Sequence, residues 1–284
     1  MKLRKVAVIG LGLIGGSLAR ALKGSGGVGE VAGADTDAGT LDYALREGVV
    51  DTCTADIAVA AAGSELVVIA THVGLIPKIA SEVLPHLSQS AVLTDVGSVK
   101  GEIVRRITPM LPPGTRFVGG HPIAGTERSG VISSDAALFS GKTVVLTPTA
   151  DTPKEALGSV ASMWELTGAK VIEMDPARHD RIFAFVSHLP HAVAYSLVAA
   201  VINQKDPAGI YDFAGGGLND FTRIAASSPE MWKDIFLMNR DDVLVSLAEF
   251  SSALRRLERL IESRDEEGLL RELRRAAAAK RKGK

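Results

Sequence analysis

A histidine flanked by glycines is the side chain in this sequence best suited to acid–base chemistry. His121 lies in the run Gly-Gly-His-Pro-Ile-Ala-Gly-Thr-Glu, which spans residues 119–127. An imidazole accepts a proton near neutral pH, and glycines beside it let a small charged substrate approach the backbone closely. We therefore expect His121 to be a general base.

A glycine-rich turn near the start of the chain predicts a dinucleotide site. The pattern Gly-x-Gly-x-x-Gly follows an expected strand at residues 5–9 and opens an expected helix at 13–23. Such a turn lets the backbone approach a pyrophosphate and points the helix N-terminus at the phosphates. The expected contacts are Gly10, Gly12, Leu13, Ile14 and Gly15. A nicotinamide bound here accepts a hydride but supplies no base, so the turn together with His121 favours a dehydrogenase.

An acidic residue at the expected interval favours NAD over NADP. Asp35 comes twenty residues after Gly15 and just past an expected strand. A carboxylate there binds the ribose hydroxyls and repels a 2′-phosphate. No arginine follows it to accept that phosphate, since the next residues are Thr36 and Asp37. Asp37 is instead expected to cap the next helix.

Polar residues follow two further expected strands. Ligands of open α/β sheets bind outside the carboxyl ends of the strands, so Thr71 is expected to contact the cofactor. Ser98 is expected where the nicotinamide and the substrate meet, and it could also cap a helix predicted at 99–110. Lys100 could attract an anionic substrate, but solvation is favoured for it.

Three aromatic residues recur on one predicted helix. His188, His191 and Tyr195 lie three and four residues apart, so they share a helix face. Two such histidines can bind zinc, but the glutamate of the metalloprotease pattern is absent. Buried structural histidines, or a hydrogen bond from one of them to substrate across a cleft, are the other interpretations. No metal is expected.

A second glycine-rich loop, residues 215–223, carries Asn219, Asp220 and Arg223. A guanidinium is well suited to forked recognition of a carboxylate. Solvation at the surface is the alternative, but Arg223 lies between a threonine and an apolar run. We expect it to bind an anionic substrate.

Composition excludes several classes of function. The 284 residues are 46% apolar and 23% charged with a net charge of −1, so no overall field attracts nucleic acid or a membrane surface. Cys53 is the only cysteine, which fits a reducing cytoplasm. Because the N-terminus enters a strand at once, no signal peptide is expected. The apolar stretches are judged too short to span a membrane.

Alternating strands and helices predict an α/β region at 1–173. Strands are expected at 5–9, 31–34, 66–70, 92–95, 117–119, 143–146 and 170–173, with helices at 13–23, 76–84, 99–110 and 153–166. Several strands are continuous apolar runs, as in a sheet covered on both faces. This indicates a Rossmann-type doubly wound parallel sheet, with antiparallel strands possible at its end.

An all-helical region is expected at 174–284. A mostly apolar helix covers 178–203, Ser228 and Pro229 open another helical region, a further segment begins between Asn239 and Asp242, and a last helix covers 266–280. A helix as apolar as 183–201 must be buried nearly all round. We therefore expect a second copy of the chain to cover it.

These strings resemble the prephenate dehydrogenase family of tyrosine biosynthesis, which includes arogenate and cyclohexadienyl dehydrogenases. The resemblance covers nearly the whole chain, and its most specific parts are Gly-Gly-His-Pro-Ile-Ala-Gly-Thr-Glu and the Ser-His-Leu-Pro-His string at 187–191. It also includes the segments 10–17, 95–100 and 215–223 together with Trp232. One departure is His72, where the family has a proline.

The resemblance implies a reaction and a set of site residues. Hydride passes from the carbinol carbon of a cyclohexadienol to NAD(P), and the ring carboxylate leaves as CO₂. His121 matches the histidine that accepts the hydroxyl proton, and Ser98 the serine that bonds this hydroxyl. Arg223 matches an arginine that binds a substrate carboxylate, and His191 a second substrate-contacting histidine. The other expected substrate contacts are Thr126, Glu127 and Asp220.

The resemblance also implies a homodimer built on the helical half. Prephenate, converted to 4-hydroxyphenylpyruvate, is preferred over arogenate because His191 and Arg223 offer donors to a pyruvyl side chain. No ACT regulatory domain or chorismate mutase segment is expected. The alternatives are a β-hydroxyacid or imine reductase, which would carry a lysine or an acid on the first long C-terminal helix, and a catalytically silent NAD-sensing or scaffold protein.

Overall fold

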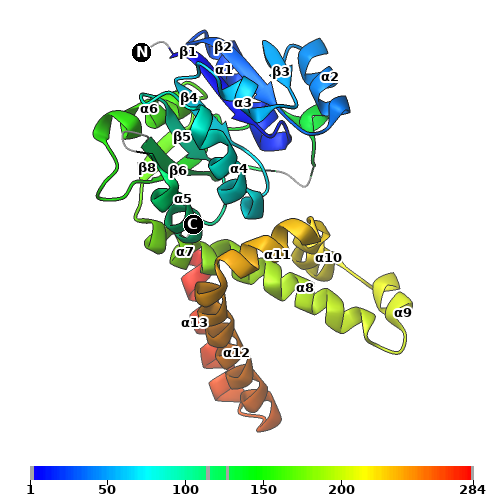
Figure 1. Cartoon of the computed structure of the whole chain (residues 1–284). Helices are drawn as coiled ribbons and strands as arrows, with labels where there is room; N and C mark the ends of the chain where they lie inside the picture. Colours follow the sequence, from blue (N-terminus) through cyan, green and yellow to red (C-terminus); the bar gives the residue numbers. More distant parts are fainter. Residues whose placement is uncertain (1–2, 113–115, 126–127, 283–284) are drawn as a thin grey trace.

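The chain folds into a sheet region followed by a helical region (Figure 1). The structure is a computed structural model that describes residues 3–112, 116–125 and 128–282. The sheet ends with β8 (Lys170–Glu173), and every later element in these ranges is helical. The predicted fold class, a Rossmann-type sheet followed by a helical region, is confirmed.

The sheet has eight strands in the order β3-β2-β1-β4-β5-β6-β7-β8. The strands before β8 are β1 (Leu3–Ile9), β2 (Val28–Ala34), β3 (Thr52–Thr54), β4 (Leu66–Ile69), β5 (Val92–Asp95), β6 (Arg116–Pro122) and β7 (Thr143–Thr147). All neighbours are parallel except β6 and β7, so the expected antiparallel pairing occurs at this end of the sheet. The order reverses between β1 and β4, where a doubly wound sheet opens a crevice for ligands.

Helices cover both faces of the sheet because its strands are apolar on both faces. Val6 and Val8 join one buried cluster, with α1 (Leu13–Ser25), α2 (Ala38–Arg46) and α6 (Lys154–Glu165). Ala7 and Ile9 join the other, with α3 (Ile57–Ala61), α4 (Ile76–Val83) and α5 (Gly101–Ile107). This alternation along one strand is the geometry of a pleated sheet.

Two elements were too short to be predicted from sequence patterns. Strand β3 has three residues and α3 has five, too few to show a period. Strand β6 is longer than expected, because its antiparallel pairing with β7 continues through His121 to Pro122. The candidate base therefore stands on a strand rather than in a loop.

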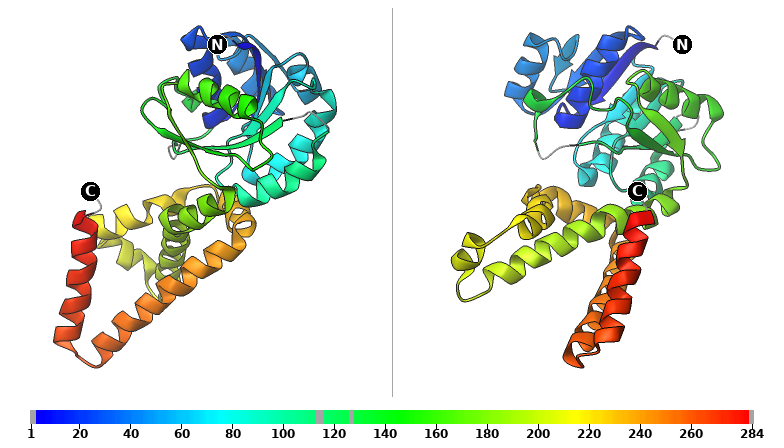
Figure 2. Two further views of the ribbon diagram at one scale, coloured as in Figure 1. Left: turned by 90° about the vertical axis from the view of Figure 1, so that its left-hand side faces the viewer. Right: turned by 180° about the vertical axis from the view of Figure 1, so that it is seen from behind.

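The helical region consists of two arms that diverge from the sheet (Figure 2). One arm runs from α7 (Pro176–Phe183) through a π-helical turn, Ala184–His188, into α8 (Leu189–Ile202). It continues with α9 (Pro207–Asp212), α10 (Gly216–Thr222) and α11 (Pro229–Met238). The other arm is the pair α12 (Arg240–Glu262) and α13 (Glu266–Lys282). The predicted cap at Ser228 is confirmed, since its hydroxyl accepts from the Met231 amide at 3.2 Å.

The first arm leaves apolar surface uncovered. Pro176–Ile202 forms 27 helical residues whose most apolar window has a mean hydropathy of 1.6. By length and composition only, this helix could cross a membrane, so the expectation that the apolar stretches are too short is wrong on length. Within the chain this segment packs against α5, α10 and α12 and carries the histidines described below. Only 11% of its most apolar window is buried in the single chain. The rest of this surface is free to contact another molecule.

Candidate functional site

The glycine turn has the geometry that a dinucleotide requires. Gly10 has a φ of 93°, and a Cβ on Gly15 would lie 1.9 Å from the Gly10 carbonyl oxygen. Gly12, the N-cap of α1, has open space where its Cβ would be, and no side chain caps the helix. The free amides at this N-terminus, which include those of Leu13 and Ile14, can therefore donate to an anion such as a pyrophosphate.

Asp35 lies beside this turn. Its carboxylate accepts the Leu11 amide at 2.8 Å and the Asp37 amide at 3.0 Å. Asp37 caps α2 by accepting the Thr40 amide at 2.7 Å, as expected. Asp35 is therefore held just after β2, with its carboxylate beside the glycine turn.

Thr71 provides a second polar group at the crevice. It follows β4, and its methyl carbon would lie 2.9 Å from a Cβ on Gly10. Its hydroxyl oxygen is buried and has no hydrogen-bond partner among the described residues. Buried hydroxyls are seldom left unpaired, so Thr71 fits a ligand group in the crevice. His72 is exposed beside it.

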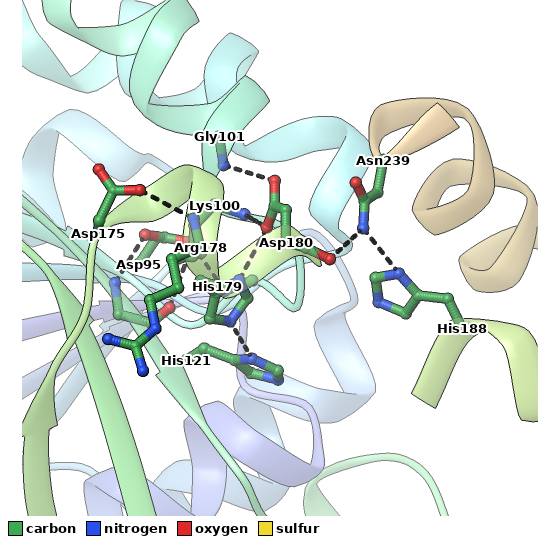
Figure 3. A network of polar contacts seen from close by, with 12 residues as sticks. Asp95, Lys100, Gly101, His121, Asp175, Arg178, His179, Asp180, His188 and Asn239 are labelled. Atoms are coloured by element: carbon green, nitrogen blue, oxygen red, sulfur yellow. Dashed lines mark hydrogen bonds and ion pairs between the residues drawn. The ribbon is translucent and has the colours of Figure 1, made fainter. Parts of the chain in front are cut away.

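A chain of hydrogen bonds leads from Asp180 through His179 to His121 (Figure 3). His121 Nδ1 lies 2.8 Å from His179 Nε2, and His179 Nδ1 lies 2.8 Å from Asp180 Oδ1. A carboxylate accepts hydrogen bonds only, so His179 carries its proton on Nδ1 and accepts at Nε2. His121 must then donate from Nδ1, which leaves its Nε2 lone pair free to take a proton.

The surroundings keep His121 neutral. Burial lowers the pKa of its imidazole well below the ordinary value of 6.5, and the nearby His179 and Lys100 lower this pKa further. Phe183 packs on both rings, with centroids 4.7 Å from His121 and 4.3 Å from His179. At neutral pH the imidazole is therefore unprotonated and held in one orientation, as a general base requires.

The start of α5 is capped from the helical region rather than by Ser98. The carboxylate of Asp180 accepts the amides of Lys100 and Gly101, each at 2.8 Å. The helix begins at Gly101, so the expectation of a Ser98 cap is wrong. Ser98 is partly buried in the loop after β5, at the carboxyl edge of the sheet. Its hydroxyl is therefore not committed to a helix cap.

Lys100 is buried rather than solvated, which corrects the expectation for this residue. Its side chain is 0% exposed, and its ammonium forms an ion pair with Asp95 and donates to the Gly120 carbonyl at 2.7 Å. It contacts the backbone beside His121 and has no free surface toward an anion. Lys100 is thus part of the support of the site.

The histidines of the Ser-His-Leu-Pro-His string surround Trp232. His191 stacks on the indole with centroids 3.6 Å apart, and its Nδ1 lies 2.9 Å from the Ser187 carbonyl. His188 Nδ1 contacts the Asn239 amide at 3.0 Å, whereas its buried Nε2 has no partner in the described part of the chain. His188 is thus buried and held by Asn239 through Nδ1, whereas His191 is partly exposed.

The remaining expected site residues lie outside the hydrogen-bonded chain at His121. The segment expected as a glycine-rich loop is helical instead, since α10 covers Gly216–Thr222 and a 3₁₀ turn follows at Arg223–Ala226. Asp220 and Arg223 are exposed at the end of α10 and just after it. Tyr195 donates to the Ser227 carbonyl at 2.8 Å, which ties α8 to the segment before α11. Thr126 and Glu127 lie outside the described residues. A group of three or more possible metal ligands does not occur within the described ranges.

Sequence reasoning missed His179, Asp180 and Asn239. The available signal was the pair His-Asp inside the first turns of the helix that carries the other histidines. Nothing local shows that this pair faces His121, because the two histidines are 58 residues apart. Asn239 joins the same network by donating to the Asp180 carbonyl at 3.0 Å.

Two family models together match most of the chain. The model described as "Prephenate dehydrogenase, nucleotide-binding domain" matches residues 18–173, and "Prephenate dehydrogenase, dimerization domain" matches residues 175–275. A cyclohexadienyl dehydrogenase of Zymomonas mobilis is 36% identical over 94% of this chain and 92% of its own length. A prephenate dehydrogenase of Bacillus subtilis is 36% identical over 94% of this chain and 72% of its own length.

Solved structures agree with this relationship. A prephenate dehydrogenase from Aquifex aeolicus, in complex with hydroxyphenyl propionate and NAD+, is 39% identical with a TM-score of 0.94, covering 100% of this chain and 99% of that one. An arogenate dehydrogenase of Synechocystis is 31% identical with a TM-score of 0.84, covering 99% of this chain and 100% of that one. The similarity therefore extends over both regions.

Proposed function

Because the chain belongs to the prephenate dehydrogenase family, we propose that it converts prephenate to 4-hydroxyphenylpyruvate with NAD as the hydride acceptor, in tyrosine biosynthesis. The observation that carries this proposal is the free Nε2 of His121, which is held by His179 at the edge of the sheet where ligands bind. The solved relative with NAD+ and hydroxyphenyl propionate supports the choice of cofactor and of substrate class.

His121 supplies the base for this reaction. NAD, bound at the glycine turn, supplies the hydride acceptor. As His121 Nε2 takes the hydroxyl proton, the carbinol carbon of prephenate loses its hydride more readily, and departure of the ring carboxylate as CO₂ makes the ring aromatic. His179 and Asp180 keep the imidazole in the tautomer that can accept the proton, and they stabilise the imidazolium that forms.

The other site residues bind and orient the two ligands. Ser98 donates to or accepts from the substrate hydroxyl and lies beside the nicotinamide. Arg223 binds a substrate carboxylate, and His191 contacts the side chain, with support from Thr126, Glu127 and Asp220. Asp35 binds the ribose of NAD, and its charge disfavours the 2′-phosphate of NADP. Thr71 contacts the cofactor through its hydroxyl, which has no hydrogen-bond partner among the described residues.

The active form is a homodimer in the cytoplasm, formed through the helical region. The matched dimerisation model and the uncovered apolar residues of both arms support it. Phe213 is 91% exposed, Val186 63% and Leu254 54%, so apolar side chains on both arms are left for a second copy to cover. Light scattering at micromolar concentration should give twice the chain mass, and a stable, active monomer would contradict this part of the proposal.

Steady-state NADH formation tests the reaction. Purified protein with NAD should reduce the cofactor when prephenate is added, with 4-hydroxyphenylpyruvate as the product. Arogenate is the matched comparison, because it differs only in an amino group where prephenate has a keto group, and because relatives that act on cyclohexadienyl substrates or arogenate match this chain. Turnover with arogenate alone would reassign the substrate. Turnover with neither compound would overturn the proposed function.

A further inference from the structure

Lys100 and Asp95 form a buried ion pair that the proposed reaction does not use directly. Both side chains are 0% exposed. Such a pair loses the hydration of two charges, and apolar residues of similar volume are often as stable in its place. A gain in stability is therefore a weak reason for this pair, and its contacts indicate a different role.

The bonds of the pair join β5 to β6 beyond the last paired residues of these strands. Regular pairing ends where Thr94 lies opposite Val118. Beyond that point, Asp95 accepts the Gly120 amide at 3.2 Å, while the Lys100 ammonium donates to the Gly120 carbonyl at 2.7 Å. The pair thus continues the connection between the two strands through side chains.

Close approach of the backbone makes this connection possible. A Cβ on Gly120 would lie 2.7 Å from the Asp95 carbonyl oxygen, and one on Gly119 would lie 2.4 Å from the Thr147 hydroxyl. A larger residue at Gly120 would push β6 away from β5 and move the Gly120 carbonyl away from Lys100. Gly120 therefore serves the ion pair as well as the substrate, whereas Gly119 permits close contact with β7.

The connection lies between the two residues expected to contact the substrate hydroxyl. Ser98 is on the segment between Asp95 and Lys100, and His121 follows Gly120 directly. Asp95 also accepts the Gly97 amide at 2.8 Å, which holds the segment that carries Ser98. The spacing between serine and base thus depends on bonds made by Asp95 and Lys100.

We propose that Lys100 is a positioning residue whose buried ammonium, bound to Asp95 and to the Gly120 carbonyl, holds Ser98 and His121 at the separation that hydroxyl oxidation needs. This inference rests on the proposed function of the same site. It assigns Lys100 no contact with substrate or cofactor. The backbone amide of Lys100 also donates to Asp180, so the same residue connects to the support of His179.

The charge of Lys100 provides a readout that a purely structural residue would not give. Asp95 from β5 and Asp180 from α7 face its ammonium. Burial is the main cause of the lowered pKa of His121, on β6, and the nearby His179, Lys100 and His188 lower this pKa further. When Lys100 is removed, burial and the two histidines remain, so the pKa of His121 should rise but stay below its ordinary value.

The test compares three variants. Lys100→Met leaves Asp95 buried without its partner, whereas the double variant Asp95→Asn with Lys100→Met removes both charges together. Lys170→Met makes the same substitution at an exposed position on β8 and is the matched control. For each protein we would measure kcat and KM for prephenate, the pH dependence of kcat, NADH binding by fluorescence, and the thermal midpoint.

If Lys100 is a positioning residue, the double variant should regain thermal stability without regaining turnover. Lys100→Met should melt at a lower temperature, and the double variant should recover most of that loss. Both should retain NADH binding but lose kcat by about 10²-fold, the effect of displacing a reacting group by about 1 Å. The acidic limb of kcat should move to higher pH in both, and Lys170→Met should match the wild type.

Three outcomes would overturn the proposal. They are a double variant whose kcat recovers together with its melting temperature, a variant that raises only KM, and a double variant that does not fold. The first makes the pair structural, the second makes Lys100 a binding residue, and the third makes the pair a requirement of folding. The proposed function is judged separately, by wild-type activity, because this test uses only ratios between variants.

Discussion

The sheet region and the helical region differ in how far each buries its apolar side chains within one chain. In the sheet region, helices on both faces enclose two buried clusters. In α8, by contrast, Ala194 is the only buried residue, and large apolar side chains are exposed on both arms. A region that buries its own core can hold a reacting group firmly, whereas one with open apolar surface is suited to bind another molecule.

The site divides its tasks along the same line. The sheet region supplies the glycine turn, Ser98 and the proposed base His121. The helical region supplies His179 and Asp180, which orient the His121 imidazole, and also the exposed Arg223. We therefore expect changes at His121 and at the residues that orient it to affect chemistry, and changes at Arg223 and the exposed apolar faces of the arms to affect binding and assembly. The predictions below test this division.

The largest expected effect is on the base itself. His121→Asn keeps a polar group of similar size but cannot accept the proton, so kcat should fall by about 10²–10⁴-fold with little change in apparent substrate affinity. In the wild type, kcat should fall as the pH drops through a value below 6.5, because the pKa of His121 is lowered. That acidic limb should be absent in the variant.

A thermal melt and NADH binding serve as controls for this variant. A folded, NADH-binding but inactive His121→Asn supports the base. If the variant retains more than about a tenth of wild-type kcat, far above what loss of a general base allows, His121 is not the base.

The helical region should respond differently. Arg223→Gln removes a charged fork and should weaken substrate binding by about 1.5–3 kcal/mol, with a smaller change in kcat. Arg46→Gln, on the surface of α2, is the matched control. A fall in kcat with unchanged KM would place Arg223 in the chemical step and break the proposed division.

Acid should destabilise the folded chain through its buried histidines. Burial lowers the pKa of His188 to about 4 from 6.5, so the unfolded chain binds more protons between these values and stability is lost as the pH falls through them. The loss from His188 at pH 5 should be about 2 kcal/mol. Urea unfolding at pH 7 and pH 5 measures it.

The slope of this pH dependence can be assigned with two variants. His188→Gln should reduce the difference in unfolding free energy between pH 7 and pH 5. His86→Gln, at an exposed position, should leave it unchanged. If the unfolding free energy changed by the same amount between pH 7 and pH 5 in both variants, protonation of His188 on unfolding would not be the cause of the loss in stability.

The smallest expected effect concerns cofactor choice in the sheet region. The wild type should prefer NAD, and Asp35→Ser should narrow the ratio of kcat/KM between NAD and NADP by about tenfold, the equivalent of one charge-assisted hydrogen bond. Asp35→Asn is the control, because it keeps an oxygen that can accept from the Leu11 amide but removes the negative charge. A narrower NAD-to-NADP ratio in this variant would therefore come from loss of the charge and not from loss of this hydrogen bond. An NADP preference in the wild type would contradict the assignment of Asp35.

Local patterns were sufficient for most of the fold. The long apolar strands, the glycine turn and the caps at Asp37 and Ser228 all follow from residues a few positions apart, and the structure has them where they were expected. The same holds for His121, because a histidine between glycines is informative without any partner. Strand β3 and α3 were missed because they are too short to show a period.

The amino-acid sequence by itself determined most of the long elements and which side chain is suited to act as a base, because hydrophobic period, turn chemistry and side-chain type act over short distances. Only the tertiary structure decided that Asp180, rather than Ser98, caps α5, and that Lys100 is buried rather than solvated. These outcomes depend on contacts between residues 80 and 20 positions apart. A lysine becomes a buried support only when the surrounding strands bring a carboxylate and a carbonyl to it, and no local pattern records that arrangement.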